Sequence, residues 1–197
     1  MSVDRFGSDG ILLGGQRLLV ADGYEVYDDA TVSGLAAAGP TATQAQIETY
    51  RGKIKLRHWD TGEEAGGNWH FTHRWKPQST AYPHMHVKLR TGTIATTAKA
   101  KFELAYILGK HGAVDSDVAI LGAEFDLSNL EQYTELYLVF PSIDMTGYYE
   151  SANVSFNLER LTATSDEYAD KLAVAEIDCH ILIQKQGTLT QTPGSGP

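Results

Sequence analysis

The sequence contains almost no cysteine and no long apolar run. Its 197 residues include one cysteine, Cys179, which excludes an internal disulfide framework and a cysteine-rich zinc site. Cys179 lies in an apolar strand pattern, so we expect a buried, unreactive thiol. No stretch approaches the ~20 apolar residues that cross a bilayer, and no positively charged leader precedes a short apolar run. The sequence therefore predicts no membrane partner and no secretion signal.

Positive charge is also scarce. Lysine and arginine number 16 against 25 acidic residues, which gives a formal net charge of −9 and a pI near 5.2. Proteins that bind nucleic acid by neutralising phosphates need a basic surface, so we expect no nucleic-acid partner. Hydrophobic residues make up 42% and charged residues 21%, which is typical of a folded globular chain.

Common catalytic motifs are missing as well. The sequence has no G-x-S-x-G, no P-loop, no H-E-x-x-H and no EF-hand spacing. Acid pairs on predicted strands, such as Glu124 with Asp126, are too common in β-proteins to indicate a glycosidase. We therefore expect a protein that is not an enzyme, with no catalytic residue and no cofactor.

The N-terminal part differs from the rest of the chain. Residues 1–40 hold seven glycines and only short apolar runs without a sustained period, so they cannot bury a core by themselves. We interpret residues 1–50 as an extended arm that docks on another surface. Within it, residues 41–50 predict a short helix, because Thr41 and Gln44 form a weak capping box and Gly52 stands where a helix would stop. The residues expected to anchor the arm are Ile11, Leu12, Leu13, Leu18, Leu19 and Val20.

From Lys53 onward, alternating patterns predict about eight strands and no helix. Turn-rich segments separate them. The predicted fold class is all-β, a jelly-roll-like antiparallel β-sandwich over residues 51–188, followed by a flexible tail over 189–197. The strand patterns are 53–58, 69–75, 82–89, 98–108, 118–127, 133–140, 154–161 and 172–184.

Histidines gather on one of these strands. In the run from Tyr82 to Leu89, the apolar residues Met85, Val87 and Leu89 point one way and His84, His86 and Lys88 point the other. We expect the apolar side to pack in the core. The second must meet water, a metal or another chain.

A metal site is one alternative for this second face. Asp178 and His180 share a strand face, so pairing of the two strands would bring three imidazoles and a carboxylate together, a ligand set for zinc or non-haem iron. A His-x-His strand also resembles cupins, although Arg90 and Thr91 stand where the cupin pattern has a glutamate. The other interpretation is a polar sheet face or a subunit contact.

The order of several motifs resembles a family of bacteriophage virion proteins. These motifs are His73-Arg74-Trp75-Lys76, Pro83-His84-Met85-His86, Phe102 to Tyr106, Asp166-Glu167-Tyr168, Ala175 to His180, and Gly187. Two differences stand out: Val87 replaces a frequent tryptophan, and Pro77 to Thr80 replaces an acidic-glycine link.

This resemblance implies a trimeric β-sandwich or jelly roll whose N-terminal arm attaches it to a phage particle. The expected function is that of an accessory virion structural protein, such as a head decoration or a head, neck or tail fibre component. Its partners would be identical subunits and other virion proteins. A carbohydrate- or receptor-binding tail module and a cupin-like metal-dependent enzyme remain alternatives. We expect the subunit or partner interface to comprise His73, Trp75, Tyr82, His84, His86, Asp178 and His180.

Overall fold

The computed structural model describes residues 3–7, 10–13, 16–18, 26–30, 43–71, 75–90, 95–149 and 152–183. Every regular element in these ranges is a β-strand. The described residues contain no helix that is long and apolar enough to cross a bilayer. The strands are β1 (Val3–Gly7), β2 (Gly10–Leu13), β3 (Gln16–Leu18), β4 (Val26–Ala30), β5 (Thr43–Gln44), β6 (Gln46–Tyr50), β7 (Ile54–Trp59), β8 (Glu63–His70), β9 (Ala81–Leu89), β10 (Lys99–Gly109), β11 (Ala119–Asp126), β12 (Glu135–Val139), β13 (Asn153–Leu161) and β14 (Leu172–Ile183).

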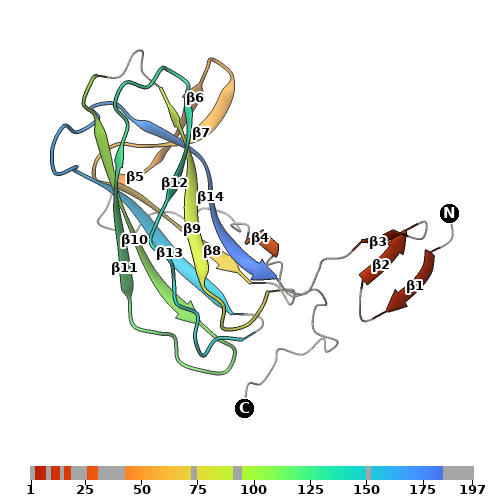
Figure 1. Ribbon diagram of the computed structural model, residues 1–197. Helices are drawn as coiled ribbons and strands as arrows, with labels where there is room; N and C mark the ends of the chain where they lie inside the picture. The colour runs from red at the N-terminus through yellow and green to blue at the C-terminus, as the bar shows by residue number, and fades with distance from the viewer. Residues whose placement is uncertain are drawn as a thin grey trace.

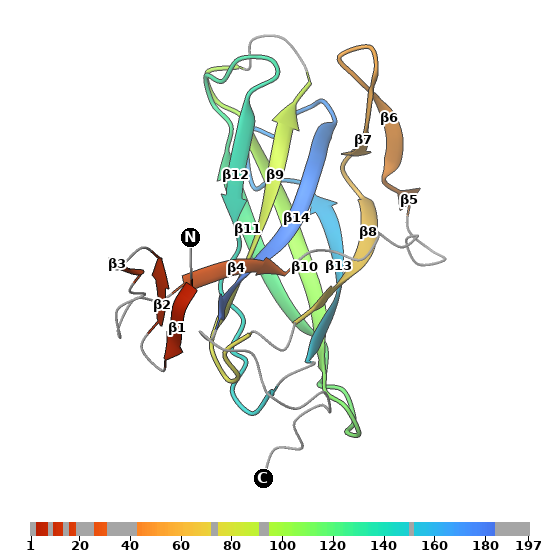
Figure 2. The ribbon, with the colours of Figure 1, turned by 90° about the vertical axis from the view of Figure 1, so that its right-hand side faces the viewer.

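Strands β7 to β14 form two sheets with jelly-roll connectivity. One sheet has the order β12-β9-β14-β7 and the other the order β11-β10-β13-β8. Successive strands alternate between the sheets except at the β10–β11 hairpin, and all these pairings are antiparallel. Figure 2 looks onto β12, β9 and β14, with β11, β10 and β13 behind them. The predicted jelly-roll-like β-sandwich is confirmed.

The core lies between the two sheets, where each strand directs alternate side chains. Met85, Val87 and Leu89 are fully buried, as their spacing predicts. Cys179 is also fully buried, and burial raises the pKa of its thiol. The cysteine is therefore part of the core packing.

The expected helix at 41–50 is wrong. Residues from Thr43 to Tyr50 form β5 and β6, which extend the two sheets at their edges. Arg51 and Gly52 both have positive φ, 47° and 79°, because they form the turn of the β6–β7 hairpin. Gly52 therefore ends a strand, and the sandwich begins near residue 43 instead of residue 51.

The N-terminal strands fall into two groups. Strands β1, β2 and β3 pair with one another in a small antiparallel sheet, whereas β4 pairs along β14 from Val26↔Ile183 to Ala30↔Cys179. Both groups are visible in Figure 1. The described residues between Val3 and Ala30 are thus all in β-strands, and β4 is hydrogen-bonded to β14 of the sandwich.

The apolar anchor residues of the arm have little structural description. Ile11, Leu12 and Leu13 are in β2, and Leu18 ends β3, but only the backbone of these strands is described. Leu19, Val20 and the tail 189–197 lie outside the described residues. Anchoring by these residues stays a prediction.

Candidate functional site

The outer face of the β12–β9–β14 sheet collects the predicted site residues, because residues directly opposite in paired strands point to the same side. His84 lies opposite Asp178, His86 opposite Tyr137, and His180 opposite both Tyr82 and Asp29. Pairing of β9 with β14, on which the predicted cluster depended, is confirmed. We call this surface the histidine face and define it by Asp29, Tyr82, His84, His86, Lys88, Glu135, Tyr137, Asp178 and His180.

His84 is at the centre of the histidine face and is only 2% exposed. Neighbouring rings cover it: the ring centroids of His180, Tyr137 and His86 lie 4.2, 4.6 and 5.6 Å from that of His84. Burial, together with the nearby His180, lowers the pKa of His84. The imidazole is therefore neutral at pH 7, although it points away from the apolar core.

His180 joins two other elements through its two ring nitrogens. Its Nδ1 lies 3.2 Å from the Tyr137 hydroxyl on β12, and its Nε2 lies 3.1 Å from Oδ1 of Asp29 on β4. Each contact fixes the ring from one side. His180 therefore links β4, β14 and β12 across the face.

A second polar group surrounds Glu135. The carboxylate forms an ion pair with Lys88, and its Oε1 lies 3.3 Å from Nδ1 of His86. These contacts lower the pKa of Glu135. Lys88 is thus paired locally with a carboxylate.

Asp178 is the unusual acid of the site. It is almost completely buried, and burial together with the carboxylates of Glu176 and Asp29 raises its pKa to about 7. Water cannot solvate the charged form well in this position. Asp178 therefore titrates near neutral pH.

Two groups of three side chains in the described residues could hold a metal ion. They are Asp29 with His84 and His180, and His84 with His86 and Asp178, and the potential ligand atoms of each group lie within 4.8 Å of one another. The second group, and two members of the first, are among the predicted residues. Asp29 was missed, because only the β4–β14 pairing brings it to this face.

Two predicted interface residues are not in this cluster. Trp75 is fully buried, packs on Phe71 with 5.0 Å between ring centroids, and donates from Nε1 to Ser79 Oγ at 2.9 Å. Its assignment to the subunit interface is therefore wrong: Trp75 is buried in the core together with Trp69 and Phe71, the residues with which its spacing aligns it. His73 lies outside the described residues.

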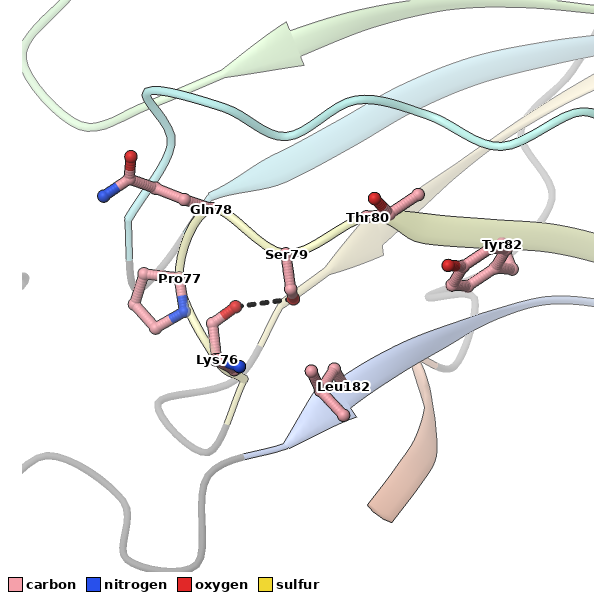
Figure 3. A pocket seen from close by; sticks show the side chains of 7 residues that line it. All are labelled: Lys76, Pro77, Gln78, Ser79, Thr80, Tyr82 and Leu182. Atoms are coloured by element: carbon pink, nitrogen blue, oxygen red, sulfur yellow. Dashed lines mark hydrogen bonds between the residues drawn. The ribbon is translucent and has the colours of Figure 1, made fainter. Parts of the chain in front are cut away.

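A shallow hollow of about 280 Å³ adjoins the histidine face at Tyr82. Its rim is the turn from Lys76 to Ser79, held by a 2.6 Å hydrogen bond from Ser79 Oγ to the Lys76 carbonyl (Figure 3). Leu182 of β14 also lines the hollow. The seven residues that line the hollow include no carboxylate and no histidine.

Comparisons with known proteins give structural neighbours only. No family model and no curated protein matches the sequence. A family 22 carbohydrate-binding module of Clostridium thermocellum Xyn10B has 12% identity and a TM-score of 0.39, covering 78% of this chain and 91% of that one. A xylan-binding domain of family 22 has 10% identity and a TM-score of 0.37, covering 76% and 86%.

A phage protein is also among the structural neighbours. The enzymatically active domain of bacteriophage CBA120 tailspike protein 4 has 10% identity and a TM-score of 0.31. The match covers 81% of this chain and 19% of that one. The strand order by itself defines the jelly roll.

Proposed function

We propose that this chain is a non-catalytic binding module of a bacteriophage particle, and that the histidine face binds carbohydrate. The observation that carries the proposal is a row of exposed aromatic and polar side chains on one sheet face. Tyr82, which lies opposite His180, and Tyr137, whose ring packs on His84, are 38% and 48% exposed. Placement on a phage particle follows from the motif resemblance alone.

The chemistry of this row suits sugars. A sugar ring offers apolar C–H faces and hydroxyl groups, so it is bound by an aromatic ring next to hydrogen-bonding groups. Tyr82 and Tyr137 supply such rings. The half-exposed side chains of Asp29, Glu135 and His180 supply acceptors and donors beside them.

The hollow beside Tyr82 adds a depression at one end of the row. Its backbone and side-chain polar groups come from the turn at Lys76 to Thr80. A shallow, polar depression next to an aromatic ring suits one sugar unit of a longer chain better than a small hydrophobic ligand.

The test is a glycan array with the full chain, followed by calorimetric titration of the glycans that bind. We expect Tyr82→Ala and Tyr137→Ala each to weaken binding at least about tenfold. Tyr133→Ala is the matched control, because Tyr133 is 36% exposed but its ring packs on Tyr50 instead of on the His84–His180 pair. Absence of any glycan signal would reject carbohydrate binding, and equal losses in all three variants would reject the histidine face as its site.

A second candidate is the structural role implied by the resemblance, a trimer in which the histidine face is buried between identical subunits. It is favoured by Val139, a 49% exposed apolar residue directly opposite His84, and by the separate β1–β3 sheet, which suits attachment to another surface. Light scattering distinguishes the two candidates. A stable trimer that Val139→Asp converts to monomer would support the structural role.

A further inference from the structure

We propose that Asp29, His84 and His180 form a binding site for one divalent ion of the zinc type, which fastens strand β4 to the sandwich. The three side chains come from three strands, β4, β9 and β14. Their potential ligand atoms lie within 4.8 Å of one another. Two imidazoles and one carboxylate are a ligand set that zinc accepts, with a fourth position left for water.

The distances suit a common ion. Zinc binds nitrogen and oxygen at about 2.0–2.2 Å, so two ligands of one tetrahedral ion lie roughly 3.3–3.6 Å apart. Asp29 Oδ1 and His180 Nε2 are already 3.1 Å apart. The ring of His84 packs on that of His180 with 4.2 Å between ring centroids, and a His84 nitrogen lies within 4.8 Å of a ligand atom of each of the other two residues.

Tyr137 prepares His180 for this role. Histidine ligands of a metal are generally oriented by a hydrogen bond at their other ring nitrogen. The Tyr137 hydroxyl oxygen lies 3.2 Å from Nδ1 of His180 and can accept a hydrogen bond from a protonated Nδ1. That arrangement leaves the Nε2 lone pair directed at the Asp29 side, where the ion would bind.

Exposure to solvent and existing contacts favour Asp29, His84 and His180 over the alternative group of His84, His86 and Asp178. Asp29 and His180 have side chains that are 51% and 39% exposed, so an ion can enter from solvent and keep a water molecule. Asp178 in the other group is almost fully buried. His86 is already engaged with Glu135 at 3.3 Å.

The position of the ligands gives the ion a structural consequence. Asp29 is the only member that comes from the N-terminal segment, and β4 is otherwise held to the sandwich by its pairing with β14. An ion that joins Asp29 to His84 and His180 adds a link that the unfolded chain lacks. Zinc should therefore fix the N-terminal segment against the sandwich, whether or not the face also binds sugar.

The test uses the full chain without a histidine tag, stripped with EDTA and titrated with ZnCl₂ by calorimetry at fixed pH. We expect one ion per chain. We also expect Asp29→Asn and His180→Ala each to weaken zinc binding at least about tenfold, and His86→Ala to leave it within about threefold. Asp29 and His180 are surface residues, so these variants should fold; an unchanged circular dichroism spectrum checks this.

Amide hydrogen exchange on the unmodified chain provides a second readout. Zinc should slow exchange in β4, from Val26 to Ala30, and leave the edge strand β11 unchanged. The proposal is overturned if zinc does not bind, if both Asp29→Asn and His180→Ala bind it normally, if His86→Ala abolishes binding, or if β4 exchanges equally fast with and without zinc.

Discussion

His84 on β9 and Asp178 on β14 are direct register partners, and their pKa values shift in opposite directions. Burial opposes the charged form of each, so His84 resists protonation and Asp178 resists ionisation. Because both buried groups favour their neutral forms, the free energy of unfolding depends on pH through each of them.

The signs of the two contributions follow from proton linkage. The folded pKa of His84 is below the unfolded value of about 6.5, so stability is lost as pH falls below 6.5. The folded pKa of Asp178, about 7, is above its ordinary value of 3.8. The folded state therefore binds the extra proton between these values, and stability is lost as pH rises from about 4 to 7.

Asp178→Asn should consequently stabilise the protein at pH 8 and have little effect at pH 4. Asparagine resembles the protonated acid and carries no charge to desolvate. A shift of this size corresponds to about 4 kcal/mol in full, and we expect about 2 kcal/mol, because the folded site can relax around the charge. Urea denaturation with EDTA present measures this difference; equal stability changes at both pH values would contradict it.

Arg160→Met should destabilise the sandwich by about 3–5 kcal/mol. Arg160 is fully buried and donates to the carbonyls of Trp59 and Asp170 at 2.9 and 2.8 Å and to Glu167 at 2.6 Å. Removing the guanidinium leaves these acceptors without their donor. Lys53→Met, at an exposed hairpin position, is the control and should change the free energy of unfolding by less than about 0.5 kcal/mol.

Gly109→Ala should cost about 1 kcal/mol, whereas Gly122→Ala should be neutral or slightly stabilising. A Cβ on Gly109 would meet Asn153 Oδ1 at 2.6 Å and Asp115 Oδ1 at 3.0 Å, so both side chains must move. A Cβ on Gly122 meets nothing within 4 Å. Thermal denaturation of the two variants compares these strand glycines directly; a larger loss for Gly122→Ala would contradict the packing described here.

A chain shortened to begin at Thr43 should be more stable than one that begins at Lys53. The second lacks β6, which pairs with β7 at the edge of the sheet and carries Glu48, the partner of Arg90 and Lys171 at 2.5 and 2.7 Å. It also loses the buried side chain of Tyr50. We expect a lower melting temperature for the shorter chain; identical melting temperatures would show that β6 does not contribute to the domain.

Cys179 should not react with a thiol reagent under native conditions. The side chain has no exposed surface, and burial holds the pKa of the thiol above its ordinary value, so the reactive thiolate is rare. Reaction should become complete when urea unfolds the chain. Rapid labelling of the native protein would show that β14 opens locally.

Much of the sandwich could be predicted from the sequence, because its strands alternate in hydrophobicity. The strand from Ala81 to Leu89 places Met85, Val87 and Leu89 in the core and the histidines opposite, as period two requires. The predicted strand 69–75 begins six residues after the start of β8, because β8 opens with the glycine-containing run from Glu63 to Asn68. Gly66 and Gly67 have no side chains, so this part of the strand shows no alternation of apolar and polar residues.

The sequence by itself determined which side chains each long strand turns outward, since that depends only on neighbours two residues apart. Only the tertiary structure decided which of those side chains meet. Asp29 is about 150 positions from His180 in the sequence, and their contact exists because β4 pairs with β14 in one particular register. His84 is likewise buried only because the rings of His86, Tyr137 and His180, from three neighbouring strands, pack around it. Local patterns could not specify these long-range pairings, because register and strand order depend on how the whole chain packs.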